Sequence, residues 1–127
     1  MGSNAYRTVN STLCPVFTVQ ENGKEKITFD NIILPLDITK QTTRKVETAI
    51  RWAKEFNSTV HVVAVVEFFD EFRKNLDDMH RVLDEVSERL HEAGIKTETA
   101  MIRNTDVAKG VINYSEEHNG DLIIIMT

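Results

Sequence analysis

Apolar residues along this chain follow two different spacings, and each spacing predicts a different kind of element. Almost continuous apolar runs, rich in β-branched residues, are typical of strands covered on both faces. Such runs, one of them partly alternating, predict strands at Asn31 to Leu36, Thr59 to Val66, Ile95 to Ile102 and Leu122 to Met126. Between them, apolar residues recur every three or four positions, which predicts helices. These helices span Gln41 to Phe56, Phe69 to Ala93 and Asp106 to His118.

The helical spacing also predicts which side chains face the core. The apolar positions of the three helices are Val46, Ala49, Ile50, Ala53 and Phe56, then Leu76, Met79, Leu83, Val86 and Leu90, and finally Val107, Val111, Ile112 and Tyr114. Charged residues between them, such as Lys45 and Arg51, are expected on the solvent side. Gly94 follows the second helix and suits the position just beyond a helix end.

Strands and helices alternate strictly from Asp30 onward. This βαβαβαβ pattern indicates an α/β fold with a parallel sheet and helices on both faces. Right-handed crossovers then require a doubly wound open sheet. The last run, Asp121 to Thr127, is interpreted as a buried strand that leads to the carboxyl end of the sheet, where ligands of such folds bind.

The first 29 residues do not follow this alternation. Asn4 to Asn10 is compatible with a short helix, and Pro15 to Val19 is interpreted as a short strand. The polar stretch from Glu21 to Lys26 predicts a turn or linker. Ser3-Asn4-Ala5 also matches a common expression scar, which is an alternative origin for the first residues.

Composition narrows the class of protein. With 127 residues, of which 41% are apolar and 28% charged, the chain suits one globular domain. A net charge of −5 argues against a nucleic-acid surface, which needs clustered cations. No apolar run reaches the roughly 20 residues that span a bilayer, so no membrane partner is expected. The N-terminus lacks the apolar core of a signal peptide and there is one cysteine, which together favour the cytoplasm.

Histidine and cysteine suggest little chemistry. The four histidines, His61, His80, His91 and His118, show no spacing typical of a zinc site, so we expect solvated side chains and no metal. Cys14 has no evident His or Asn partner and is interpreted as a packed small residue.

The charged residues show no catalytic set either. Arg103 and Lys109 flank the start of the third helix and could contact phosphate, but ordinary surface charge is the simpler interpretation. Carboxylates do not pair in any arrangement that stands out from the acidic surface. The sequence therefore predicts a protein that is not an enzyme.

Several segments resemble the universal stress protein family. They are Ile33 to Asp37, Val62 to Glu67, Leu90 to Ile95, Asp121 to Met126 and, from the N-terminal part, Gly2 to Ala5 and Cys14 to Val19. The resemblance covers nearly the whole chain in permuted order, because the N-terminal part is similar to the end of a family domain. It implies a tail-like segment at 1–20, a linker at 21–29 and a family domain at 30–127 that lacks its last helix–strand unit. A tandem-domain fragment, a natural truncation and an engineered permutant would all give this order.

The resemblance, with the crossover rule, implies the sheet of the adenine-nucleotide alpha-hydrolase-like folds. The strand order is then 3-2-1-4, and Pro15 to Val19 fills the fifth position beside Leu122 to Met126. That segment could belong to the same chain or to a partner. We expect a homodimer with the N-terminal strand at or near the interface, because segment exchange is an inexpensive route to dimers.

A nucleotide site is also implied by the resemblance. Pro35, Asp37 and Val65 would contact adenine and ribose, and Met126, Thr127, Gly2 and Ser3 would form the phosphate side for ATP or AMP. Thr127 stands where the family usually has glycine, and the Gly-x-x-Gly turn is missing from the sequence. The structural alternative is that Asp37 caps the first helix and Val65 is a core residue.

Two functional hypotheses follow. The first is a non-catalytic stress-response module that acts through dimerisation and binds little or no nucleotide. The second is a regulatory module that binds ATP or AMP at the carboxyl ends of strands one and four. The glycine turn missing from the sequence favours the first hypothesis.

Overall fold

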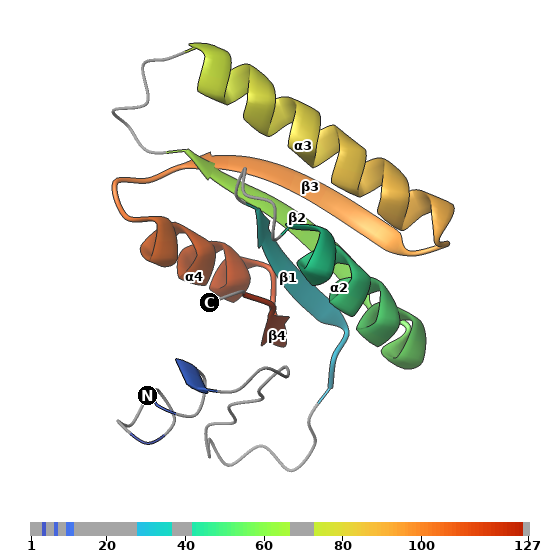
Figure 1. Cartoon of the computed structure of the whole chain (residues 1–127). Helices are drawn as coiled ribbons and strands as arrows, with labels where there is room; N and C mark the ends of the chain where they lie inside the picture. The colour runs from blue at the N-terminus through green and yellow to red at the C-terminus, as the bar shows by residue number, and fades with distance from the viewer. Residues whose placement is uncertain are drawn as a thin grey trace.

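Four strands and three helices alternate along the part of the chain that the structure describes (Figure 1). The structure is a computed structural model that describes residues 28–36, 42–66 and 73–125, together with Asn4, Arg7, Asn10 and Ser11. The elements are β1 (Asn31–Leu36), α2 (Thr42–Phe56), β2 (Thr59–Val66), α3 (Arg73–Glu92), β3 (Lys96–Arg103), α4 (Val107–Glu117) and β4 (Leu122–Ile123).

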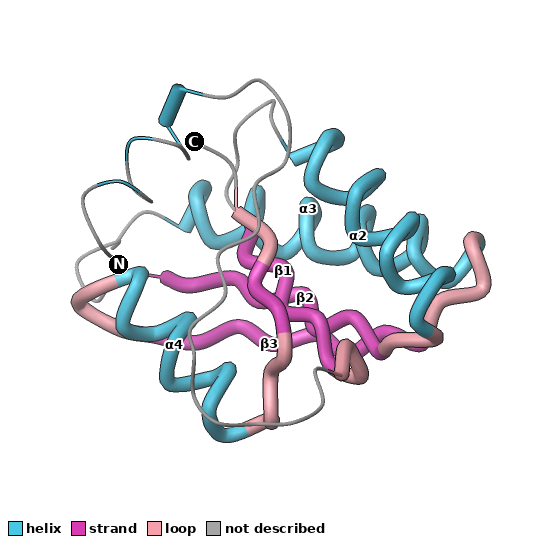
Figure 2. The backbone as a smooth tube through the Cα atoms, turned by 90° about the horizontal axis from the view of Figure 1, so that it is seen from below, coloured by secondary structure: helices cyan, strands magenta, loops and turns pink. Residues whose placement is uncertain are grey.

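The strands form one parallel sheet in the order β3-β2-β1-β4. The predicted α/β class, parallel direction and strand order are therefore confirmed. Figure 2 shows α2 and α3 on one face of this sheet and α4 on the other. The fold is the doubly wound arrangement that right-handed crossovers produce.

Successive residues of β1 enter two separate cores, because side chains of a strand point alternately to opposite faces. Ile32, Leu34 and Leu36 pack under α2 and α3, and Ile33 packs under α4. The larger core includes Val60, Val62 and Leu90, whereas the smaller core consists of Ile33, Val63, Val65, Val111 and Tyr114. A continuous apolar run is thus explained by helices on both faces.

Most element boundaries agree with the predictions to within one residue. β1 and β2 match fully, β3 is shifted by one residue, and α2 begins at Thr42. Gly94 ends α3 as predicted, with a φ of +76° and its N–H donating to the His91 carbonyl at 2.9 Å. Asn4, Arg7, Asn10 and Ser11 are helical, which agrees with the short helix expected there. The rest of that helix, the strand expected at Pro15 to Val19 and residues 69–72 lie outside the described residues.

The predicted helix faces are wrong at four positions. Phe56, Val107 and Ile112 are 43%, 44% and 49% exposed, whereas Lys45 is buried. Phe56 contacts the rings of Phe29 and Trp52. α4 lies mainly over β1 and β2, and its buried stripe is narrow and consists of Gly110, Val111, Tyr114 and Ser115. Ile112 falls beside that stripe, whereas Val107 is exposed at the amino-terminal end of α4.

The prediction of a buried strand from Leu122 to Met126 is also wrong. β4 pairs with β1 over two residues only, Leu122 and Ile123. Both are half-buried, and Ile125 is 61% exposed. The reason is that β4 is an edge strand of the described sheet, so one of its sides has no covering strand there. Met126 lies outside the described residues.

Candidate functional site

The carboxyl end of β1 carries a buried lysine contact. Lys45, in the first turn of α2, donates a hydrogen bond from Nζ to the Pro35 carbonyl oxygen at 2.8 Å. Lys45 is only 4% exposed, so its aliphatic stem fills space between α2 and β1 while the ammonium reaches the strand. The side chain therefore connects the start of α2 to the carboxyl end of β1, directly before the predicted ligand-binding segment.

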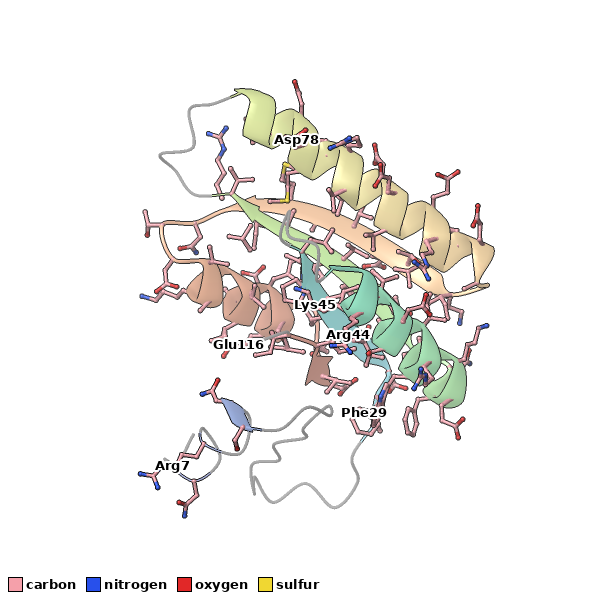
Figure 3. All side chains as sticks on the ribbon, in the orientation of Figure 1. Arg7, Phe29, Arg44, Lys45, Asp78 and Glu116 are labelled. Carbon is pink, nitrogen blue, oxygen red and sulfur yellow. The ribbon has the colours of Figure 1, made fainter. Side chains whose placement is uncertain are left out.

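Two cationic residues lie next to each other at the same end of the sheet, where β1 leads to α2. Arg44 is exposed beside Lys45, and the first turn of α2 contains no acidic residue (Figure 3). A helix N-terminus already carries partial positive charge, so two cations there add to it instead of balancing it.

Val65 lies on the α4 side of the same end of the sheet. It is 8% exposed and belongs to the smaller core. The backbone of Gly110 in α4 approaches it closely, because a Cβ added at Gly110 would lie 3.2 Å from Val65 Cγ1. The structural alternative for Val65, a core residue, is the one that its burial supports.

The structure brings only part of the predicted nucleotide site into view. Pro35 and Val65 lie on neighbouring strands, where Pro35 is paired with Val63. The other predicted members, Asp37, Met126, Thr127, Gly2 and Ser3, lie outside the described residues. Arg103 and Lys109 are exposed at the same end of the sheet, as the surface-charge interpretation predicts.

A second polar centre, which sequence analysis missed, lies beneath α4 at the opposite end of the sheet. His61 of β2 is 3% exposed, so the expectation of solvated histidines is wrong for this residue. Its Nε2 lies 3.0 Å from Asn31 Oδ1, and its Nδ1 lies 3.1 Å from the Tyr114 hydroxyl oxygen. The ring of His118 stacks on Tyr114 with 3.8 Å between the centroids.

Burial and neighbouring charges shift two titrations in this centre. Burial lowers the pKa of His61 from its ordinary 6.5, Glu98 raises it and His118 lowers it. Burial also raises the pKa of Tyr114, and Glu98 raises it further. The fold therefore favours neutral forms of both groups.

Both missed side chains had a signal in the sequence. Lys45 stands four and eight residues before Ala49 and Ala53, so it shares their helix face. His61 lies within a strand predicted to be covered on both faces, and such a histidine has to be buried with hydrogen-bonding partners. In each case the polar residue type led to an expectation of exposure, although the position in the pattern indicated burial.

The described residues hold no group of three or more His, Cys, Asp or Glu side chains that could bind a metal ion. Likewise, no helix in this part of the chain has both the length and the apolar character needed to cross a membrane.

A family model covers most of the chain. Residues 28–127 match the model of the universal stress protein family. The chain belongs to this family. The resemblance seen in the sequence is thereby confirmed, and the match includes all four strands of the described sheet. Comparison with curated proteins gave no significant match.

Solved universal stress proteins share the fold. One from Burkholderia pseudomallei is 21% identical with a TM-score of 0.70, over 78% of this chain and 82% of that chain. One from Archaeoglobus fulgidus, in complex with dAMP, is 13% identical with a TM-score of 0.66, over 75% and 78%.

An Arabidopsis thaliana member with AMP bound is 11% identical with a TM-score of 0.60, over 77% of this chain and 76% of that chain. At these identities the likeness concerns the fold alone. It supports the parallel β3-β2-β1-β4 sheet as the family arrangement.

Proposed function

We propose that this universal stress protein is a non-catalytic stress-response module that acts by pairing with a second copy at the β4 edge of the sheet. The observation that carries the proposal is the chemical difference between the two edges of the described sheet. β3 at one edge carries Lys96, Glu98 and Arg103, and charged side chains are a common protection of a free edge.

Within the described residues, the β4 strand itself carries no charged side chain. Leu122 and Ile123 are followed by Ile124 and Ile125, and Ile125 is 61% exposed. An apolar strand at the edge of a sheet favours the addition of another strand. Pro15 to Val19, with β-branched and aromatic residues, is the segment we propose for that position, supplied by either copy of a homodimer.

Sedimentation of the intact chain tests this function. We expect a dimer for the intact chain and a monomer for a variant that begins at Lys26, which lacks the proposed strand. A monomeric intact chain at high concentration would contradict the proposal. A dimer that persists after truncation would contradict the role of the N-terminal strand.

A second candidate function is adenine-nucleotide binding at the carboxyl ends of β1 and β4. The dAMP and AMP in the related structures and the exposed Arg44 in the first turn of α2 favour it. Thr127 opposes it, because a Cβ where the family has glycine hinders close approach of the backbone to phosphate. We therefore expect weak or no binding of ATP with Mg²⁺ in calorimetry. If binding is measured, Asp37→Ala should weaken it.

A further inference from the structure

His61 connects three strands and one helix through its two ring nitrogens. Asn31 of β1 faces Nε2, whereas Tyr114 of α4 and Glu98 of β3 both face Nδ1. The Tyr114 hydroxyl oxygen is 3.1 Å from Nδ1, and Glu98 Oε2 is 3.4 Å from the same atom. Two partners from different elements therefore compete for one nitrogen.

Asn31 in turn holds the connection between α4 and β4. Its side-chain Nδ2 donates to the Asn119 carbonyl at 3.4 Å, and its backbone N–H donates to Asp121 Oδ2 at 2.9 Å. The Asp121 backbone N–H donates back to the Asn31 carbonyl at 2.8 Å. The α4–β4 unit, residues 107–125, is thus joined to His61 at Tyr114 and at Asn31.

These contacts fix the proton positions on the neutral ring. Since Asn31 Nδ2 donates to Asn119, Asn31 Oδ1 is the atom that faces His61, and this oxygen can only accept. Nε2 of His61 must then carry the proton. Nδ1 is left as an acceptor, and the Tyr114 hydroxyl donates to it.

Protonation of His61 changes which of the two partners Nδ1 prefers. A protonated Nδ1 donates, and a carboxylate accepts from a cation more strongly than a phenol does. Glu98 provides that carboxylate, with a side chain that is 61% exposed. The Tyr114 hydroxyl then loses its buried acceptor.

The other titratable groups around the ring are few. From α4 they are Tyr114 and, at the helix end, His118, whose ring centroid is 5.7 Å from that of His61. From β3 it is Glu98. Asp121 lies beyond Asn31 and accepts from its backbone N–H. Glu98 on β3 raises the pKa of His61, whereas His118 at the end of α4 lowers it. The two neighbouring charges therefore act on the protonation of His61 in opposite directions.

We propose that His61 is a proton-operated switch: neutral, it holds the α4–β4 unit through Tyr114 and Asn31, and protonated, it exchanges Tyr114 for Glu98 and loosens that unit from the sheet. The consequence is local. The β4 edge becomes mobile under mild acid while β1, β2 and the core beneath α2 and α3 remain folded. The switch does not depend on the pairing proposed above.

Hydrogen exchange of the intact chain, corrected for intrinsic rates, tests the switch. The backbone amides of His118, Gly120 and Ile124 report on the α4–β4 unit, because each donates to a carbonyl within 3.0 Å. Between about pH 7.5 and about pH 5.5, we expect their protection to fall about tenfold more than that of the β2 amides.

Two variants identify the groups responsible. His61→Gln cannot be protonated in this range and should make the protection of the α4–β4 unit independent of pH. Glu98→Gln removes an exposed carboxylate without entering the core and should suppress most of the acid effect. Glu88→Gln is the matched control, since Glu88 is exposed on α3 and should leave the effect unchanged.

Three results would overturn the switch. One is an equal loss of protection in β2 and in the α4–β4 unit, which would indicate global unfolding. Another is an acid effect of unchanged size in Glu98→Gln. The third is full protection of the α4–β4 unit at about pH 5.

Discussion

Gly120 lies so close to Ile33 that a Cβ added at Gly120 would meet Ile33 Cγ1 at 2.8 Å. Ile33 is fully buried at the centre of β1, and the same Cβ would also collide with Ser115 Oγ of α4. The glycine therefore allows the chain to leave α4 and enter β4 directly against the neighbouring strand. Its N–H donates to the Ser115 carbonyl at 2.7 Å, which closes the helix end.

Gly120→Ala should consequently destabilise the protein by about 3 kcal/mol, because overpacking forces the buried Ile33 side chain or the backbone to move. Urea unfolding at neutral pH measures the change. Gly94→Ala is the matched control: its Cβ would meet nothing within 4 Å, so only the positive φ of 76° costs free energy, about 1 to 2 kcal/mol. Equal losses in the two variants would contradict the steric explanation.

The second prediction concerns the buried Lys45. Lys45→Met keeps a similar apolar stem but removes the donor that lies 2.8 Å from the Pro35 carbonyl. We expect a loss of about 1 to 3 kcal/mol in the free energy of unfolding, because the part-buried hydrogen bond from the lysine ammonium to the Pro35 carbonyl is lost. Arg44→Met, at the exposed neighbouring position, should change stability by less than about 0.5 kcal/mol. An unchanged stability in Lys45→Met would show that the hydrogen bond contributes nothing net.

The strands and the buried side chains differ in how far the sequence predicts them. The strands were predictable because continuous apolar runs between amphipathic helices have few alternatives. Their order was predictable because the crossover rule was combined with the resemblance to the universal stress protein family. The contacts of Lys45 and His61 were not, since their partners Pro35 and Tyr114 come from other elements. A side chain's exposure follows from such tertiary partners as much as from its type.

The extent of β4 was missed for a related reason. Five apolar residues in a row predict a strand that is covered on both faces. Such a strand is fully buried only if neighbouring strands also pair with both of its edges. Here β1 covers one side, while the segment proposed for the other, Pro15 to Val19, lies outside the described residues. The nucleotide site remains a prediction for the same reason, because Asp37 and Thr127 also lie outside them.

The third prediction concerns the pH dependence of stability. Because burial holds the pKa of His61 below 6.5 in the folded state, the unfolded chain binds the proton more readily. The contribution of His61 is therefore fully present above pH 6.5 and is lost as the pH falls from there through the folded-state pKa. Urea unfolding across this range should show lower stability in acid. In His61→Gln this part of the pH dependence should disappear.

The fourth prediction separates the two charges beside His61. His118 lowers the pKa of His61, so His118→Gln should raise it. Glu98 raises the same pKa, so Glu98→Gln should lower it. A ¹H–¹⁵N NMR titration of the imidazole nitrogens measures both and reports the Nε2-protonated form directly. Shifts of equal sign in the two variants would show that the charges do not act on His61 as the geometry indicates.

The last prediction concerns the apolar β4 edge. Ile125→Lys places a charge beside the strand end that we propose to be covered in the dimer, and lysine on an edge opposes strand addition. Ile125 is 61% exposed, so the substitution should leave the stability of a monomer almost unchanged while it shifts the intact chain from dimer to monomer in sedimentation. Ile112→Lys is the matched control, because Ile112 is 49% exposed on α4 and does not belong to β4, and it should leave the dimer intact. Dissociation in both variants would contradict an interface limited to the β4 edge and would indicate a wider surface that includes α4.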